Sequence, residues 1–249
     1  MYQLGLVSVS FRQHTPWEII AAAKQAGLAC IEWGSDVHAP CSQPDRLKAI
    51  REEGESSGIS CCSYGTYFRI GVNHTEEILP YIAGAKLLGT DILRVWCGDR
   101  DSERYGAKER EQLFAQCREL AGIAKDNGVT LCMECHGNTF TNRAEGALAL
   151  VEAVRSQNIQ LYWQPNQFRT LEENLTYARK TALYTRHIHV FFWKEYDRFP
   201  LAEGRQAWKE YLKEFPGERA LLLEFMPDNR IETLPMEAET LRQIIWEEA

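Results

Sequence analysis

The chain has 249 residues, of which 45% are hydrophobic and 25% charged, and this composition is ordinary for a globular protein. Its formal net charge of -7 at pH 7 lacks the basic excess that a broad nucleic-acid footprint needs, so we expect no nucleic-acid partner. No apolar run reaches the roughly 18 residues of a membrane span, and the first residues, MYQLGLVSVSFRQH, lack the features of a signal peptide. With eight cysteines that we expect to be reduced thiols, these features predict a cytoplasmic protein without a membrane partner.

Short apolar runs alternate with longer amphipathic segments eight times along the chain. The runs are rich in Val, Ile, Leu and aromatic residues and are bounded by turn residues, as strands are. The predicted strands are Gln3–Ser8, Ala29–Trp33, Ile59–Tyr64, Ile92–Trp96, Val129–Glu134, Gln160–Gln164, Arg186–Phe192 and Ala220–Phe225. The predicted helices are Pro16–Ala26, Pro44–Ser57, Thr75–Leu88, Ala107–Asn127, Arg143–Gln157, Leu171–Leu183, Glu203–Phe215 and Leu234–Glu248.

Residues that commonly begin or end helices stand at several of the predicted helix boundaries. Thr15 and Pro16 are typical of a helix start, and four glycines stand where the first four helices should end: Gly27, Gly58, Gly89 and Gly128. Strand–helix alternation at this spacing implies parallel strands with right-handed crossovers. Eight such units in about 250 residues fit a closed (β/α)₈ TIM barrel better than an open sheet. We see no linker or composition break, so residues 1–249 are expected to form a single domain.

Four polar side chains stand at or near the ends of the last four predicted strands: Glu134, Gln164, His189 and Glu224. Functional residues of such barrels come from the C-terminal ends of the strands. Side chains alternate faces along a strand, and each of the four shares the face away from the more apolar, helix-packing residues. We therefore expect all four to point inward and to converge at one open mouth of the barrel.

The convergence of these four polar groups is unfavourable unless the charges of the two carboxylates are compensated. Burying an unpaired carboxylate costs several kcal/mol or shifts its pKa strongly. A divalent cation resolves this, and the donor types suit Mn²⁺, Mg²⁺, Co²⁺ or Zn²⁺. The alternative is that each residue pairs with an arginine, a lysine or a backbone group, and the residues alone leave both interpretations open.

Several short motifs, in order, resemble those of the xylose-isomerase-like TIM-barrel superfamily, in its sugar isomerase/epimerase branch. The motifs are Ile31-Glu-Trp-Gly34 followed by Asp36-Val-His38, Leu131-Cys-Met-Glu134-Cys-His136, Trp163-Gln-Pro-Asn166, His187-Ile-His189-Val190 and Leu223-Glu224-Phe225. Each is short, but together they extend over the whole chain. The resemblance implies a metal held by Glu134, position 164, His189 and Glu224.

Position 164 departs from that family, which has Asp where this chain has Gln. The implied ligand set then carries two negative charges, which balance a divalent ion. We expect weaker binding of hard cations but a more Lewis-acidic metal, because the ligands donate less charge. The opposing possibility is that the site has lost its metal.

The resemblance also implies a reaction, which is proton abstraction next to a carbonyl through a metal-stabilised enediolate. Glu134 and Glu224 would stand on opposite faces of the substrate carbon, one removing a proton and the other returning one. His136, two residues beyond Glu134, would donate to a substrate oxygen or else serve only in the loop. The predicted activity is thus that of a metal-dependent sugar isomerase or epimerase.

Further candidates for substrate binding are His38, Trp33, Arg94, Trp96 and Lys194, all at or just past strand ends. Tryptophans at the mouth favour stacking against a sugar, although we expect about half of those at strand ends to pack under helices instead. Arg94 would neutralise a buried carboxylate or hold an anionic substrate group. No glycine-rich cradle follows the last strand, so a carbohydrate without phosphate is expected.

The same residues support other functions. A metal-dependent dehydratase or lyase of a cyclic polyol would use the same parts, with an acid such as His136 expelling a hydroxyl. A non-catalytic sugar-binding barrel would follow if Gln164 marks a dead site. The superfamily's DNA-repair nuclease branch ranks last, because it needs more His and Asp ligands than six scattered histidines supply. The sequence leaves the oligomeric state open, a homo-oligomer included.

Overall fold

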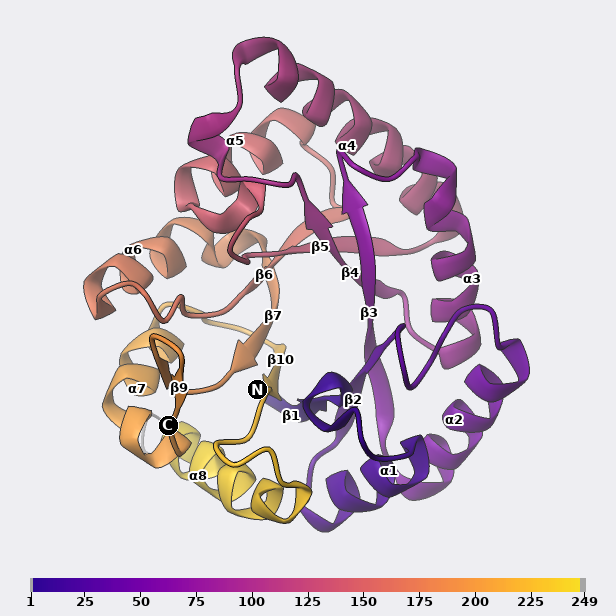
Figure 1. Cartoon of the computed structure of the whole chain (residues 1–249), viewed down its shortest axis with the longest axis vertical. Helices are drawn as coiled ribbons and strands as arrows, with labels where there is room; N and C mark the ends of the chain where they lie inside the picture. The colour runs from indigo at the N-terminus through magenta and orange to yellow at the C-terminus, as the bar shows by residue number, and fades with distance from the viewer. Residues whose placement is uncertain (1, 247–249) are drawn as a thin grey trace.

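The computed structural model describes residues 2–246, and these form one closed barrel of eight parallel strands (Figure 1). Around the barrel the strands follow the order β1-β10-β7-β6-β5-β4-β3-β2. Their bounds are β1 Tyr2–Val7, β2 Cys30–Gly34, β3 Ser60–Ile70, β4 Ile92–Cys97, β5 Thr130–Glu134, β6 Ile159–Trp163, β7 Thr185–Val190 and β10 Arg219–Leu223. The predicted single-domain (β/α)₈ fold is confirmed.

Helices surround the barrel on its outer side (Figure 1). They are α1 Pro16–Gln25, α2 Pro44–Ser57, α3 Leu79–Leu88, α4 Ala107–Asn127, α5 Ala144–Val154, α6 Leu171–Thr181, α7 Arg205–Lys213 and α8 Leu234–Trp246. Thr15 caps α1 as predicted, since its side chain accepts a hydrogen bond from the Glu18 amide. The prediction that the last helix reaches Glu248 extends beyond the described residues.

The glycines after the first four helices adopt the left-handed conformation expected of them. Gly58, Gly89 and Gly128 are the C-caps of their helices, with φ of 74°, 82° and 67°. Gly27 also has a positive φ, of 66°, but the C-cap of α1 is Ala26. In α1 the glycine therefore stands one residue after the C-cap. Glycine occupies a positive φ without the steric penalty that a Cβ brings.

Two differences from the prediction change the mouth of the barrel. Strand β3 continues from Tyr64 to Ile70, with an irregular register against β4 after Gly65, so it is six residues longer than expected at its C-terminal end. A short antiparallel hairpin, β8 Trp193–Lys194 with β9 Asp197–Arg198, stands between β7 and α7. Both additions lie at the C-terminal ends of the barrel strands and build up its mouth.

The core has two parts. A large apolar cluster lies between the strands and the helices, and it includes Leu131, Met133 and Leu223. A smaller cluster fills the barrel interior and includes Val7, Ile92, Cys132, Tyr162 and Leu222. Because these side chains fill the interior, the barrel is a packed core and is closed below its C-terminal mouth, as in other barrels of this kind. Among the described residues, no helix combines the length and apolarity that crossing a membrane requires.

Candidate active site

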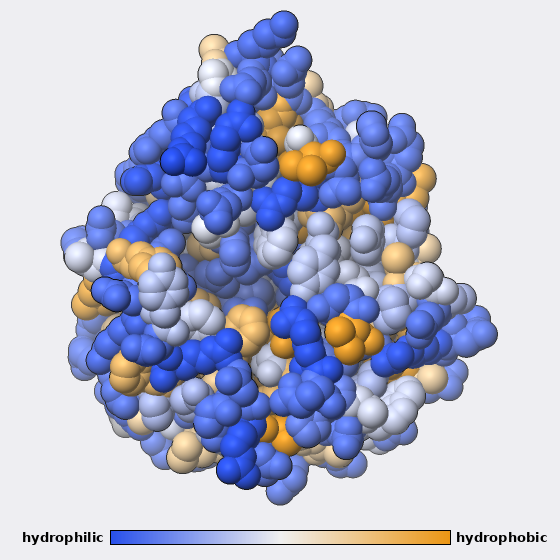
Figure 2. Space-filling view, in the orientation of Figure 1, coloured by the Kyte–Doolittle hydropathy of each residue, from blue (hydrophilic) through white to orange (hydrophobic). Residues whose placement is uncertain are grey.

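A cavity of about 440 Å³ opens at the C-terminal ends of the strands. Figure 2 shows it as a hollow near the centre of this face of the molecule. Its volume is within the range of small-molecule sites. The residues that line it include both predicted carboxylates and many aromatic rings: Val9, Arg12, Tyr67, Arg94, Trp96, Glu134, Cys135, His136, Gly137, Asn138, Gln164, Pro165, Asn166, Gln167, Phe168, Phe191, Trp193, Glu224 and Phe225.

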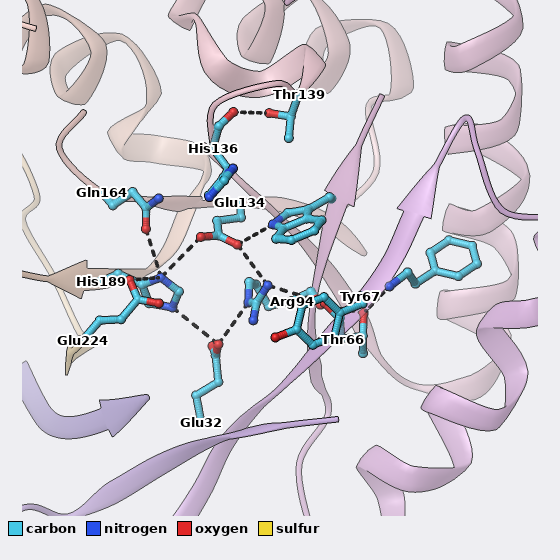
Figure 3. Close-up of polar contacts among 12 residues, drawn as sticks. Glu32, Thr66, Tyr67, Arg94, Glu134, His136, Thr139, Gln164, His189 and Glu224 are labelled. Atoms are coloured by element: carbon cyan, nitrogen blue, oxygen red, sulfur yellow. Dashed lines mark hydrogen bonds and ion pairs between the residues drawn. The ribbon is translucent and has the colours of Figure 1, made fainter. Parts of the chain in front are cut away.

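The four predicted metal ligands converge at the bottom of this cavity (Figure 3). His189 is the hub, because its Nδ1 lies 3.1 Å from Gln164 Oε1, 3.5 Å from Glu224 Oε2 and 3.7 Å from Glu134 Oε1. His189 has no exposed surface, and both glutamates are more than nine-tenths buried. The predicted convergence and the inward direction of the four side chains are confirmed.

Arg94 joins this group from β4 and is itself buried. Its Nη1 donates to Glu134 Oε2 at 2.9 Å, and its Nε donates to Glu32 Oε1 at 3.0 Å (Figure 3). Trp96 Nε1 also donates to Glu134 Oε2, at 2.6 Å. Glu134 therefore uses one carboxylate oxygen for protein partners and turns the other toward His189.

The two cavity carboxylates differ in acidity because their partners differ. Burial raises the pKa of Glu134, but the charges of Arg94 and His189 outweigh burial and hold its pKa well below the usual value. Burial also raises the pKa of Glu224, and the nearby Glu134 charge adds to that rise, so the pKa of Glu224 stays above its usual value. Burial lowers the pKa of His189, but the carboxylates of Glu224 and Glu32 outweigh burial and raise that pKa to about 10.

Charge balance and spacing test whether these residues fit a divalent cation. Three carboxylates (Glu32, Glu134 and Glu224) and one guanidinium (Arg94) leave two negative charges, and protonation of His189 offsets only one of them. Ligand atoms at about 2.1 Å from one ion lie roughly 3.0–3.4 Å from their neighbours, close to the spacings around His189 Nδ1. The donor chemistry therefore fits a divalent ion.

The fit depends on the amide as well as on the charged side chains. Within residues 2–246, no group of three or more His, Cys, Asp or Glu side chains is arranged as a metal site by itself. The shortest contact to His189 Nδ1 comes from Gln164, and the two carboxylate oxygens lie slightly farther away.

His136 also faces the cavity, beside Trp96. Its ring lies against the indole with centroids 5.2 Å apart, and its Nδ1 is 2.8 Å from the carbonyl oxygen of Gly137. A carbonyl only accepts hydrogen bonds, so Nδ1 carries a proton and Nε2 is left for other partners. The backbone oxygen of His136 accepts a hydrogen bond from Thr139 Oγ1, which holds the loop in place.

Three residues that we expected to bind substrate do not line this cavity. Trp33 packs in the core between strands and helices, because it alternates with the inward-facing Glu32 along β2. His38 is fully buried and held by Ser8 Oγ and the His14 carbonyl. Lys194 is exposed on the β8–β9 hairpin, where its ammonium lies over the rings of Phe192 and Phe199.

The prediction that about half of the strand-end tryptophans pack under helices is confirmed. Trp163 lies in an aromatic cluster with Trp208, Tyr211 and Phe215. Trp96 and Trp193 line the cavity instead. His187, from the motif that also contains His189, is buried and accepts a hydrogen bond from the Ala220 amide.

Among the cavity residues that escaped prediction, Arg12 and Tyr67 contact each other. Arg12 follows β1, and its Nη2 donates to the hydroxyl of Tyr67 at 2.6 Å, while its Nε donates to Asp36 at 2.8 Å. Tyr67 reaches the cavity only because β3 continues past Tyr64. The alternating pattern of Tyr67 to Ile70 was the signal that would have revealed the longer strand.

Proteins built on a closed (β/α)₈ barrel place their functional sites at the C-terminal ends of the strands. The polar side chains of this cavity lie at that end. The family model described as "xylose isomerase-like TIM barrel" matches residues 20–243. The chain therefore belongs to the xylose isomerase-like TIM-barrel family, as its motifs indicated. No curated protein matches the sequence.

Solved structures of low sequence identity share the fold. The probable 3-DHS dehydratase AsbF, involved in petrobactin synthesis, from Bacillus anthracis is 16% identical, with a TM-score of 0.79 over 97% of this chain and 99% of that one. The IOLI protein with a bound zinc atom is 17% identical, with a TM-score of 0.77 over 99% and 97%. D-allulose 3-epimerase from Methylomonas sp. is 15% identical, with a TM-score of 0.71 over 98% of both chains.

Proposed function

We propose that this protein is a divalent-metal-dependent enzyme that moves a proton on a carbon next to the carbonyl of a small sugar or sugar derivative, in the manner of an isomerase or epimerase. The observation that carries the proposal is the convergence of one amide and two carboxylate oxygens on His189 Nδ1, at the bottom of a cavity of about 440 Å³. Glu134, Gln164, His189 and Glu224 would hold the ion. Mn²⁺, Mg²⁺, Co²⁺ and Zn²⁺ are all compatible with these donors.

The ion, when bound, would supply electrophilic assistance to the oxygen atoms of the substrate. Glu134 and Glu224 would exchange protons with the substrate carbon. They come from β5 and from the residue after β10, which β6 and β7 separate in the barrel, so the two carboxylates reach the cavity from different sides. That separation suits an epimerisation, in which one group removes a proton and the other returns one.

Other cavity residues would orient the substrate. Trp96, Phe191 and Trp193 offer aromatic faces to the apolar C–H surface of a sugar ring. Arg94 lines the cavity but is committed to Glu32 and Glu134, so its main role is to keep those carboxylates ionised. The similarity to D-allulose 3-epimerase supports the reaction class, and the zinc of the IOLI structure supports the metal.

A second candidate, a dehydratase of a cyclic polyol, is favoured by one observation. His136 Nε2 makes no hydrogen bond among the described residues and stands at the cavity, where the imidazolium form of His136 would give its Nε2 proton to a departing hydroxyl and become neutral. The similarity to the probable 3-DHS dehydratase supports this reading. Mass spectrometry of products separates the two candidates, because a dehydratase product is lighter than its substrate by one water.

The test of the main proposal combines metal analysis with proton exchange. Purified protein should contain about one divalent ion per chain, and a ketose incubated with it in D₂O should gain deuterium next to its carbonyl. Glu134→Ala should lose both properties. A wild-type protein that binds no added divalent ion contradicts the metal, while ligand binding without any deuterium exchange or water loss would indicate a non-catalytic sugar-binding barrel.

A further inference from the structure

Glu32 is a buried carboxylate directly below the site, yet it does not line the cavity. It has no exposed surface. Its Oε2 accepts a hydrogen bond from Ser63 Oγ at 2.9 Å, and its Oε1 lies 3.0 Å from Arg94 Nε and 3.4 Å from His189 Nε2 (Figure 3). A group in this place acts on a substrate only through its neighbours.

The contact with His189 concerns the nitrogen that faces away from the ligand set. His189 Nδ1 faces Gln164, Glu134 and Glu224, while Nε2 faces Glu32. In the described part of the chain, His189 Nε2 has no hydrogen bond of good geometry. An ion at Nδ1 would displace the proton from that nitrogen, and the one N–H that remains would lie at Nε2, where the Glu32 carboxylate accepts it.

Glu32 also affects the position of Glu134, because both carboxylates contact Arg94. One guanidinium bridges the two carboxylates, with Nε on Glu32 and Nη1 on Glu134. The backbone leaves room for this bridge, because a Cβ at Gly65 would lie 2.8 Å from both Arg94 Nη2 and Glu32 Oε1. Removing the charge of Glu32 would loosen the Nε end of this bridge, so that Arg94 would hold Glu134 less firmly in place.

We infer that Glu32 is a positioning residue, which orients His189 so that Nδ1 faces the ligand set and aligns Glu134 through Arg94. The effect of Glu32 on metal binding rests on the proposed function. The interaction of Glu32 with His189 is independent of that function. Partners in this outer position usually change metal affinity 10- to 100-fold when they are replaced. Glu32→Gln keeps the size and one acceptor oxygen but removes the charge.

The experiment measures Zn²⁺ affinity by calorimetry and the Nε2–H proton of His189 by NMR on protein with labelled histidine, both without and with Zn²⁺. Wild type should show a low-field, slowly exchanging Nε2–H proton. Glu32→Gln should shift that proton upfield and raise the Zn²⁺ Kd about 10- to 100-fold. Ser63→Ala, which loosens Glu32 but keeps its charge, should give a smaller change in the same direction.

Glu237→Gln is the matched control, because Glu237 is also buried but lies away from the cavity, on α8. It should leave both measurements unchanged. If Glu32→Gln does not fold, Ser63→Ala decides the question alone. An unchanged Nε2–H proton and Zn²⁺ Kd would overturn the inference while leaving the proposed function intact. A wild type that shows the low-field proton but binds no Zn²⁺ would contradict the proposed function and leave the role of Glu32 standing.

Discussion

Arg94 Nη1 lies 2.9 Å from Glu134 Oε2, while Glu134 Oε1 turns toward His189 at 3.7 Å. The sequence left open whether the polar strand ends pair with an arginine or bind a metal. In Glu134 the two roles fall on different oxygens, so an ion pair and metal coordination are compatible. The arginine also explains how three buried glutamates coexist at one barrel mouth.

Replacing Arg94 with methionine should destabilise the protein strongly. The substitution would leave Glu32 and Glu134 as buried carboxylates without their shared cation, and breaking such pairs costs about 3–5 kcal/mol. Urea unfolding of metal-free protein would measure the loss in the free energy of unfolding. Adding Glu32→Gln to Arg94→Met should recover part of it, and a loss below about 1 kcal/mol in the single variant would show that the pairing contributes little.

Gln164→Glu should tighten metal binding. It places a third carboxylate beside His189 Nδ1, where the amide oxygen now lies at 3.1 Å. A divalent ion gains attraction from the added charge, so the Kd for Mn²⁺ should fall about tenfold or more. The same substitution should lower the stability of the metal-free protein, because it adds a further negative charge beside those of Glu134 and Glu224.

Gln167→Glu is the control for that comparison, since Gln167 lines the cavity but makes no contact with His189 among those described. It should change the Mn²⁺ affinity much less. Equal tightening by both variants would mean that general charge in the cavity, rather than coordination at position 164, sets the affinity.

Gly65→Ala and Gly122→Ala should shift stability in opposite directions. At Gly65 the new Cβ would lie 2.8 Å from Arg94 and Glu32, and such overpacking typically costs about 1–3 kcal/mol. Gly122 is exposed within α4 and a Cβ there meets nothing within 4 Å, so alanine should stabilise the helix by roughly 0.5–1 kcal/mol. Chemical denaturation of both variants gives the comparison, and a neutral Gly65→Ala would refute the close packing around Arg94.

Glu237 gives the protein a pH dependence unrelated to the cavity. Its Oε2 accepts a hydrogen bond from the Leu201 amide, and its buried Oε1 has no partner in the described structure. Burial raises the pKa of Glu237 above its usual value. The folded state therefore binds this proton more tightly than the unfolded state does, so the contribution to stability is full below the unfolded pKa and is lost as pH rises through the folded pKa.

Glu237→Gln removes that titration while keeping an acceptor for Leu201. At pH 7 the variant should be more stable than wild type by about 1 kcal/mol, because an unpaired buried charge is gone. The advantage in Tm should shrink as pH falls toward 4. A difference in Tm that stays constant between pH 4 and pH 7 would show that ionisation of Glu237 is not the cause.

Local patterns in the chain contained most of the fold. Strand alternation of period two and helix punctuation by Thr15 and the capping glycines depend on near neighbours, so they can be read without knowing the tertiary structure. The same parity separated Glu134 and Glu224, which face the barrel interior, from Met133 and Leu223, which face the helices. It also separates Glu32 from Trp33, a distinction that would have removed Trp33 from the substrate-binding set.

The sequence by itself thus determined the eight-fold barrel and the convergence of Glu134, Gln164, His189 and Glu224. Only the tertiary structure decided which partner each side chain takes. The register between β2 and β3 shifts between Ile31 and Glu32, which brings Glu32 opposite Ser63. Contacts such as Glu32 with His189 join strands far apart in the chain, and their distances depend on barrel closure and register, which no local pattern of residues encodes.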